Sequence, residues 1–219
     1  MADFPSTQWS LIRGSALTEV DRRAAFGTLV QVYRPAIRAY LRARLGGEDA
    51  EDALQGFLAQ SWEHAWFARA DPESGSFRGF LLVMIKRHVG HWREKRRLDT
   101  EQIDAHAAIV DADPSSDPQR AFDSRFLMTL TQQGLERLRA AYSVRGRAQL
   151  CEALLPLLTS PPGKGDLSEL SQQLGMPANT LAVELRRLRE RLAGAMREQL
   201  AELCVDAATA EQEWQQLRG

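Results

Sequence analysis

The sequence predicts an all-α protein: two helical domains joined by an acidic flexible linker, the second containing a helix-turn-helix. Three observations favour this fold class. Leucine, alanine and arginine are abundant, and runs of alternating β-branched residues are missing. Apolar residues recur at three- and four-residue steps over long stretches, which is the period of a helix with one buried face. Segments rich in proline and glycine separate these stretches and predict loops between several helices.

The positions of the loops predict the domain organisation. Residues 7–45 are expected to form two helices, and Pro35 should kink or interrupt the second. Helical periodicity resumes at Ala121 after an acidic segment and is broken near Gly146. We expect the C-terminal segment 211–217 to pack back on the second domain. The predicted parts are a first domain over 1–97, an acidic linker over 98–120, a second domain over 121–199 and a C-terminal helical extension over 200–219.

Length and composition narrow the class of protein. The chain has 219 residues, of which 44% are hydrophobic and 26% charged, as expected of a folded soluble protein with one or two domains. It has no apolar run of 18 residues, and its first residues lack the pattern of a signal peptide. Cys151 and Cys204 form no CxxC motif. These features predict a cytoplasmic protein without membrane insertion.

Charge is segregated along the chain, although the formal net charge is only −1. Residues 86–97 hold six bases and one acid, residues 99–123 hold seven acids and one base, and residues 186–197 hold five bases and one acid. A near-neutral total therefore does not exclude nucleic-acid binding, because the two basic tracts are local. Basic runs are also common on ordinary solvated helix faces, so charge alone leaves both interpretations open.

Two neighbouring segments predict amphipathic helices of opposite charge. Residues 48–66 begin with a cluster of acids and continue with an apolar face that includes Leu54 and Trp62. Carboxylates in a first turn also complement the helix dipole, so the cluster alone has an ordinary structural explanation. Residues 77–97 place Phe77 and Ile85 on one face and bases roughly opposite, a stripe that suits a phosphate backbone.

The second half of the chain contains a helix-turn-helix pattern. Asp166 and Glu169 form a predicted capping box at the start of a short helix, which should end at Gly175. Pro177 then begins a longer helix whose outer face would enter a DNA major groove. Pairs of helices with this spacing are common and often bind nothing, so the motif alone is a moderate signal. The buried stripe of the longer helix is expected at Leu181, Leu185, Leu188, Leu192 and Met196.

These segments together resemble the bacterial RNA polymerase sigma factors of the extracytoplasmic-function (ECF) type. The resemblance is carried by DAEDALQGFLAQSW at 49–62, GSFR at 75–78 and LSELSQQLGMPANTLAVELRRLRERL at 167–192, and the opening FPSTQWS at 4–10 is similar to one subgroup. The chain departs from the family pattern at Gly56. A second departure, at Ala182, Val183 and Glu184, weakens the expectation of hydrogen-bonded base recognition there.

The resemblance implies a role for particular residues. The acidic helix would dock on the β′ clamp helices of core RNA polymerase through Asp49, Glu51, Asp52, Gln55 and Phe57. The basic helix would hold the melted −10 element through Arg78, Lys86, Arg87, Arg93 and Arg97. The helix-turn-helix would contact the −35 element through Asn179, Thr180, Val183, Arg186 and Arg187. The linker would thread toward the polymerase active cleft.

The expected function is therefore that of a transcription initiation factor rather than an enzyme. Its partners would be core RNA polymerase (the β′ clamp helices and the β subunit) and promoter DNA. Such factors are often restrained by an anti-sigma factor, by phosphorylation or by a C-terminal extension, and the sequence does not select among these regulators. We expect no cofactor and no metal, because His88 and His91 have no further ligands near them in sequence.

Two alternatives make different predictions. A stand-alone helix-turn-helix regulator would bind duplex DNA tightly without polymerase, usually as a dimer, and would leave the acidic helix without a role. An enzyme is disfavoured because the chain contains no P-loop, no G-x-S-x-G, no HExxH and no plausible pair of catalytic carboxylates.

Overall fold

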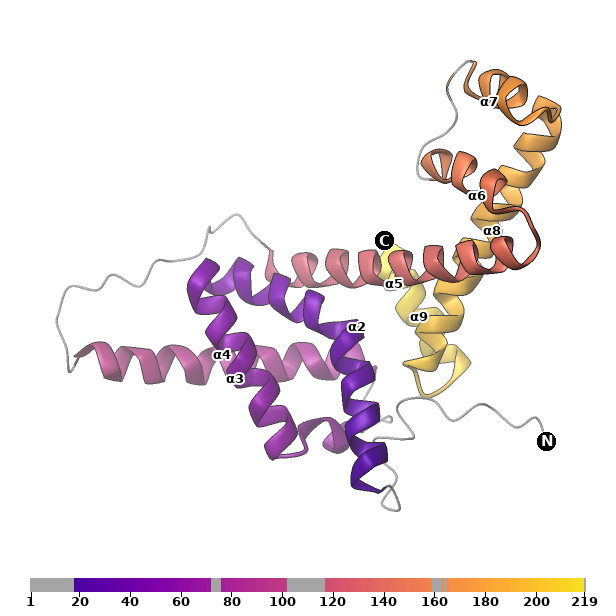
Figure 1. The fold of residues 1–219 in the computed structure, drawn as a ribbon. Helices are drawn as coiled ribbons and strands as arrows, with labels where there is room; N and C mark the ends of the chain where they lie inside the picture. The colour runs from indigo at the N-terminus through magenta and orange to yellow at the C-terminus, as the bar shows by residue number, and fades with distance from the viewer. Residues whose placement is uncertain (1–17, 72–75, 102–116, 159–162, 164, 219) are drawn as a thin grey trace. The chain divides into compact units, whose positions relative to one another are not determined.

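The described part of the chain is helical. The computed structural model describes residues 18–71, 76–101, 117–158, 163 and 165–218. Within these ranges the chain forms eight α-helices, two short 3-10 helices and no strand (Figure 1). The all-α prediction is confirmed for them. Residues 102–116, most of the predicted linker, lie outside the described residues, as do the FPSTQWS motif and Gly75. Among the described helices, none is long and apolar enough to cross a membrane.

The chain divides into two compact units, which we call the first and the second unit. The first unit comprises residues 1–129 and 200–219, and the second comprises residues 130–199. In its described residues the first unit contains α2 (Glu19–Leu45), α3 (Gly47–Glu63), η1 (Trp66–Arg69), α4 (Phe77–Glu101), the start of α5 (Pro118–Val144), the end of α8 (Ala178–Glu202) and α9 (Ala207–Arg218).

Helix α2 begins at a capping box and continues through a proline. The Thr18 hydroxyl accepts a hydrogen bond from the backbone N–H of Asp21, whose carboxylate accepts one from the backbone N–H of Thr18. Pro35 lies inside the helix, where it removes one backbone hydrogen bond and its ring crowds the preceding turn. Figure 1 shows α2 changing direction along its length without ending, as expected of a proline kink.

Aromatic residues from three helices form the centre of the first unit. Tyr33 of α2 stacks on Phe126 of α5 with ring centroids 4.8 Å apart and meets Phe77 of α4 edge-on at 5.4 Å. Leu54 of α3 and Ile85 of α4 are also fully buried. Burying an apolar side chain of this size contributes about 1.5–3 kcal/mol. The start of α5 is therefore part of the first core.

The boundaries around the predicted linker differ from expectation. Helix α4 continues to Glu101, and α5 begins at Pro118, inside the segment predicted as linker. The carboxylate of Asp117 accepts hydrogen bonds from the backbone N–H groups of Gln119 and Arg120, at 2.9 and 3.2 Å. An aspartate N-cap followed by proline strongly favours the start of a helix. Asp117 and Pro118, which were predicted as part of the acidic linker, therefore begin α5.

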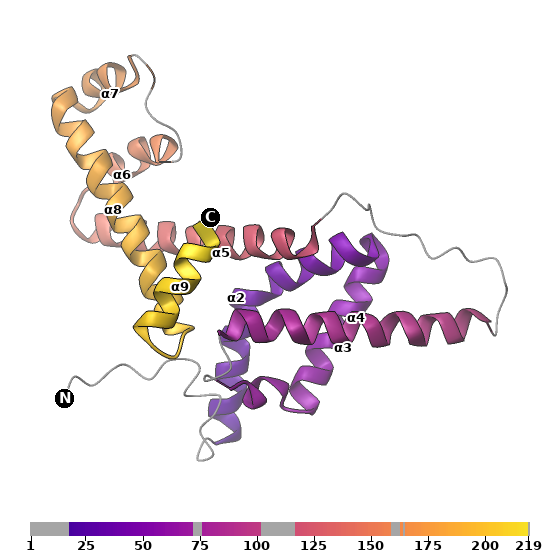
Figure 2. The same cartoon turned by 180° about the vertical axis from the view of Figure 1, so that it is seen from behind.

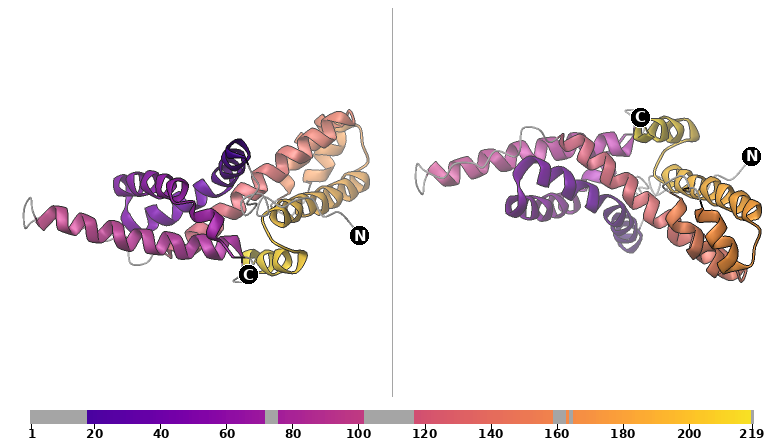
Figure 3. Two further views of the ribbon diagram at one scale, coloured as in Figure 1. Left: turned by 90° about the horizontal axis from the view of Figure 1, so that it is seen from below. Right: turned by 90° about the horizontal axis from the view of Figure 1, so that it is seen from above.

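The C-terminal helix belongs to the first unit. The expectation that residues 211–217 pack on the second domain was wrong, because α9 lies in the first unit and Glu213 forms an ion pair with Arg78 of α4. Figures 2 and 3 show α9 beside the N-terminal end of α4. Periodicity shows that α9 has a buried face but does not show which helix covers it.

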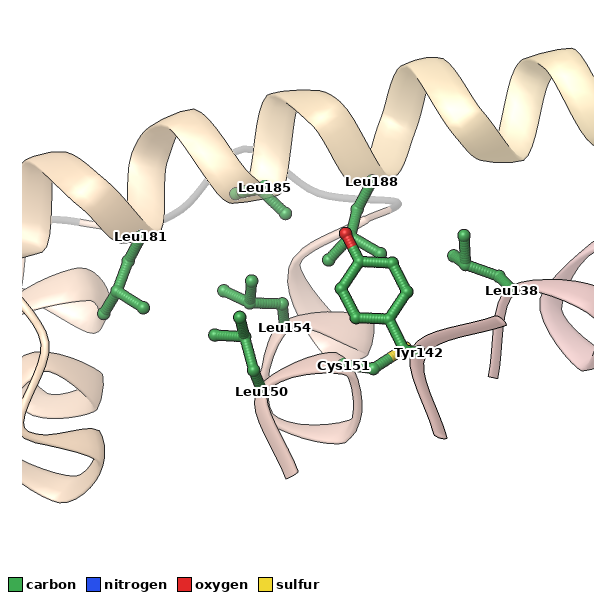
Figure 4. Packing of buried hydrophobic residues seen from close by; sticks show 8 residues of the cluster. All are labelled: Leu138, Tyr142, Leu150, Cys151, Leu154, Leu181, Leu185 and Leu188. Atoms are coloured by element: carbon green, nitrogen blue, oxygen red, sulfur yellow. The ribbon is translucent and has the colours of Figure 1, made fainter. Parts of the chain in front are cut away.

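The second unit has its own apolar core. It contains the rest of α5, α6 (Ala148–Leu154), η3 (Leu155–Leu157), α7 (Asp166–Leu174) and most of α8. Figure 4 shows the buried cluster, in which α8 faces α5 and α6. Gly134 of α5 lies against α8 so closely that an added Cβ would lie 2.9 Å from Leu192. The cluster consists of Leu138, Tyr142, Leu150, Cys151, Leu154, Leu181, Leu185 and Leu188.

Candidate docking and nucleic-acid interfaces

Helix α3 presents an acidic first turn from a glycine-rich start. Gly46 has a φ of +86°, in the region that favours glycine, and lets the chain reverse between α2 and α3. The N-cap makes no side-chain hydrogen bond, so Glu48 and Asp49 complement the helix dipole instead. The opposite face is buried through Leu54 and Phe57. The helix therefore holds its acids at an exposed edge of the first unit.

The acids of α3 differ in how they are held. Glu51 pairs with Arg38 and with Arg42 of α2, the latter at 3.2 Å. The hydrogen bond from Arg38 is the main cause that lowers the pKa of Glu51. Asp49 pairs with Arg96 of α4 at 2.9 Å. Asp52 is exposed. Asp52 is thus the predicted docking acid most accessible to a partner. The side chains of Asp49 and Glu51 are about two-thirds buried, and docking would replace their arginine partners with groups of the polymerase.

The structure removes Phe57 from the predicted docking surface and keeps Gln55 on it. Phe57 is fully buried, with its ring centroid 5.8 Å from that of Trp66 and 5.5 Å from that of His88. A side chain in this position packs α3 against its neighbours and is not accessible to a partner in this structure. Gln55, two residues earlier, is exposed. The motif match could not separate the two, because it does not say which side of the helix faces the core.

His88 joins α3 to α4 and is a structural histidine. Its Nε2 lies 2.9 Å from the carbonyl oxygen of Ala53, to which it donates a hydrogen bond. Burial lowers the pKa of His88, which favours the neutral ring. His91 is exposed, and the described residues contain no group of three or more side chains suited to hold a metal ion.

The basic face of α4 borders a hollow of the first unit. Lys86 and Arg87 are exposed, and Arg93 is half-buried with its Nη2 donating to the carbonyl of Arg44 at 2.9 Å. Arg97 pairs with Glu94 at 2.9 Å on the surface. A hollow of about 470 Å³ lies beside this face. It is lined by Tyr40, Arg44, Lys86, Val89, Gly90, Arg93, Asp117, Pro118 and Gln119.

The hollow combines three bases with one acid, a balance that favours an anion. Gly90 adds no side chain to its wall, and an added Cβ there would meet nothing within 4 Å. The hollow brings Arg44, which sequence reasoning missed, beside the predicted Lys86 and Arg93. Arg44 belongs to the last turn of α2, and only the packing of α2 against α4 makes it a neighbour of the basic face.

Arg78 lies away from this face, in the interior of the first unit. Its side chain is 8% exposed and pairs with Asp123 of α5 and Glu213 of α9. Its Nη2 also donates to the side-chain oxygen of Gln216 at 2.6 Å. With these acceptors in place the guanidinium is covered from solvent, so its predicted contact with DNA stays a prediction that requires these partners to move.

Two helices, α7 and α8, occupy the segment predicted as a helix-turn-helix, and the start of α7 differs from expectation. Helix α7 ends at Leu174, and Gly175 has a φ of +62° as expected of a glycine C-cap. The predicted capping box does not form, because Gly165 is the N-cap and makes no side-chain hydrogen bond. Asp166 instead accepts a hydrogen bond from the backbone N–H of Gly163 at 2.7 Å.

The outer face of α8 exposes the predicted residues of the second unit together. The expected stripe of Leu181, Leu185, Leu188 and Met196 is buried, and Leu192 is partly buried. The opposite face is therefore available to a partner. All five predicted residues are exposed on it: Asn179, Thr180, Val183, Arg186 and Arg187.

Glu184 is buried beneath this face and holds two bases. Its Oε1 lies 3.0 Å from Arg187 and 3.4 Å from Arg147, which follows the turn after α5. Burial acts to raise the pKa of Glu184, but Arg147 and Arg187 outweigh it and the pKa is lowered. Sequence reasoning missed Arg147, because no motif contains it and only the fold brings it to α8.

A comparison with protein families finds a match for part of the first unit. Residues 29–98 match the family model of sigma-70 region 2. The match spans most of α2, all of α3 and η1, and nearly all of α4. These residues are similar to a sigma-70 region 2. The region supports a sigma factor role in transcription initiation, and the sigma-70 family is a non-enzymatic family whose members bind core RNA polymerase and promoter DNA. No curated protein and no solved structure matched the chain.

Proposed function

We propose that this chain is an ECF-type sigma factor, which docks on core RNA polymerase through α3 and directs it to promoters through α4 and α8. One observation carries the proposal. The region 2 match coincides with a helix whose acids lie at an exposed edge, next to a helix with exposed bases. A stand-alone DNA-binding regulator has no use for the first of these two helices.

Docking on polymerase uses the exposed edge of α3. Asp52 and Gln55 are exposed one turn apart and would contact the β′ clamp helices first. Asp49 and Glu51 keep the edge acidic and are already desolvated in part by their own arginines. A basic or polar partner surface would replace those arginines, so complementary charge would guide docking more than it would add affinity.

Recognition of the −10 element uses α4 and the hollow beside it. Lys86 and Arg87 would contact phosphates of the melted strand from the exposed face, with Arg97 at the far end of the same helix. Arg44 and Arg93 at the hollow would hold a further phosphate. Contacts of this kind position a strand without selecting its sequence, so base selection requires other side chains.

Recognition of the −35 element uses the outer face of α8. Asn179 lies near the start of the helix, where a recognition helix meets base edges, and its amide can pair with a base. Arg186 and Arg187 lie further along and would contact phosphates, and Arg147 is close enough to Glu184 to join them. Val183, 40% exposed, offers an apolar contact such as a thymine methyl group accepts.

The proposal is tested by capture of core RNA polymerase on the immobilised full-length protein. We expect wild type to retain the polymerase and Asp52→Lys to lose at least ten-fold in affinity. Glu63→Lys is the matched control, since it makes the same change of charge at another exposed position of α3. Equal loss in both variants would indicate a general charge effect. No retention of any form, with tight duplex binding by the protein alone, would favour the stand-alone regulator.

A further inference from the structure

Arg78 forms a buried polar site that draws on three helices. Its guanidinium contacts the carboxylates of Asp123 and Glu213 and the side-chain oxygen of Gln216. The side chains of Arg78 and Glu213 are 8% and 6% exposed. Burying an arginine requires that its donors be satisfied, because an unpaired charge in the interior is strongly unfavourable. Two of the three partners come from α9, so α9 is needed to complete the site.

The other buried residues of α9 lie on the same face as Glu213. Ala210 and Trp214 are buried together with Glu213, whereas Glu211, Gln212 and Gln215 are exposed. The helix has 12 residues, three of which are buried. Elements held by a small number of buried groups open at lower free energy than the core, and they can open without unfolding it. Helix α9 is thus a separable part of the first unit.

The acceptors around Arg78 are the kind that a nucleic-acid backbone would provide. A guanidinium binds carboxylate and phosphate oxygens in the same forked geometry. Arg78 is the second residue of α4, the helix that carries Lys86 and Arg87. Of the five bases on α4 assigned to the −10 element, Arg78 is the one that the fold buries. Its carboxylate partners therefore occupy donors that would otherwise bind phosphate.

We propose that α9 is a releasable clasp whose Glu213 occupies Arg78 in place of a nucleic-acid phosphate, so that release of α9 exposes Arg78 to the DNA strand. The DNA-binding part of this inference rests on the proposed function. The clasp itself does not, and its opening is measured separately. In the free protein the clasp is closed, and the affinity of the first unit for single-stranded DNA is lower than the bases of α4 alone would give.

Cys204 provides a probe of the clasp. It is buried just before the start of α9. Burial raises the pKa of its thiol to about 12, and the nearby carboxylates of Glu213 and Asp206 contribute to the rise. A buried thiol with so little thiolate reacts slowly, and exposure would restore ordinary reactivity. The chain has one other cysteine, Cys151, which is buried in the core of the second unit. In a Cys151→Ala background, thiol labelling therefore reports on Cys204 alone.

The first measurement is the rate at which DTNB labels Cys204 in the full-length protein. We expect Glu213→Gln to raise the rate at least ten-fold, with the far-UV circular dichroism unchanged. Gln216→Ala should raise the rate as well, because it removes a partner of Arg78 without changing the charge near Cys204. Glu211→Gln is the matched control, because it removes the same charge from the exposed face of the same helix. A chain truncated after Asp206 serves as a fully open reference. Labelling of Glu213→Gln at the wild-type rate would overturn the clasp.

The second measurement is the affinity for a fluorescein-labelled, random-sequence 20-nucleotide single strand, followed by anisotropy. We expect Glu213→Gln and the truncated chain to bind at least five-fold more tightly than wild type, and addition of Arg78→Gln to Glu213→Gln to remove the gain. Fast labelling of Cys204 without a gain in affinity for single-stranded DNA would contradict the proposal that α9 keeps Arg78 from binding DNA. Failure of polymerase capture would reject the proposed function while leaving both results interpretable.

Discussion

The two units differ in how well the exposure of their predicted site residues follows from a helix pattern. In the second unit, all five predicted residues lie exposed on the outer face of α8. In the first unit, Phe57 is buried although it shares a motif with exposed Asp52, and Arg78 is buried although it shares α4 with exposed Lys86. The exposed face of α8 lies on the side of the helix away from its one buried apolar stripe, whereas α3 and α4 pack against several other helices. A motif therefore predicts which residues are exposed best where one helix packs against one core.

The largest expected effect is on stability, and it should differ between alanine substitutions at Phe57 and at Val183. Because Phe57 is fully buried, Phe57→Ala should lower the free energy of unfolding by about 3–5 kcal/mol. Val183→Ala, at a residue 40% exposed, should change it by less than about 0.5 kcal/mol. Urea unfolding followed by circular dichroism measures both. If Phe57→Ala remained as stable as wild type and lost polymerase binding, the docking role would be restored to Phe57.

A second comparison concerns the bases of α8. The double substitution Arg186→Ala/Arg187→Ala should weaken binding to a random 25-base-pair duplex about ten-fold or more, because two phosphate contacts are lost. The slope of log affinity against log salt should fall by about one for each arginine. Arg139→Ala, which removes an exposed base paired with Glu152 elsewhere in the second unit, is the control. Equal loss in the control would show that the outer face of α8 is not the DNA site.

A third comparison uses pH to test the support beneath that face. Glu184 has a lowered pKa in the folded protein, so its ionised form stabilises the fold. This stabilisation is present above the usual value of 4.5 and is lost as pH falls through the folded pKa. Glu184→Gln should therefore reduce stability near neutral pH and flatten its decline below pH 4.5. Thermal unfolding from pH 7 to pH 3 measures this, and an unchanged acid limb would contradict it.

The smallest effects should differ in size at two helical glycines. At Gly90 an added Cβ meets nothing within 4 Å, so Gly90→Ala should stabilise the first unit by about 0.5–1 kcal/mol. At Gly134 an added Cβ would lie 2.9 Å from the terminal Cδ1 of Leu192, which must move, so the gain in helix propensity is offset and Gly134→Ala should change stability by less than about 0.5 kcal/mol. Chemical unfolding of the two variants measures both. A gain from Gly134→Ala as large as that from Gly90→Ala would contradict the close packing of α5 on α8 at this point.

The sequence by itself determined the helices and the sides on which they are buried. Apolar side chains at a 3.6-residue period must lie on one face, so the buried stripe of α8 and the core face of α4 follow from spacing alone. Local chemistry also placed the end of α7, because Gly175 adopts a conformation that other residues avoid. The same local rules, applied to Asp166, predicted a capping box that the chain replaced with Gly165.

Only the tertiary structure decided which distant residues meet. Arg78 is separated from Glu213 by 135 residues, and no local pattern indicates that the two form an ion pair. In the same way, Arg147 reaches Glu184, and Arg44 reaches the hollow beside Arg93, through the packing of separate helices. Periodicity is a property of one helix and records that a face is covered. The identity of the covering element depends on the summed burial and charge pairing of the whole unit, which is expressed only when the chain has folded.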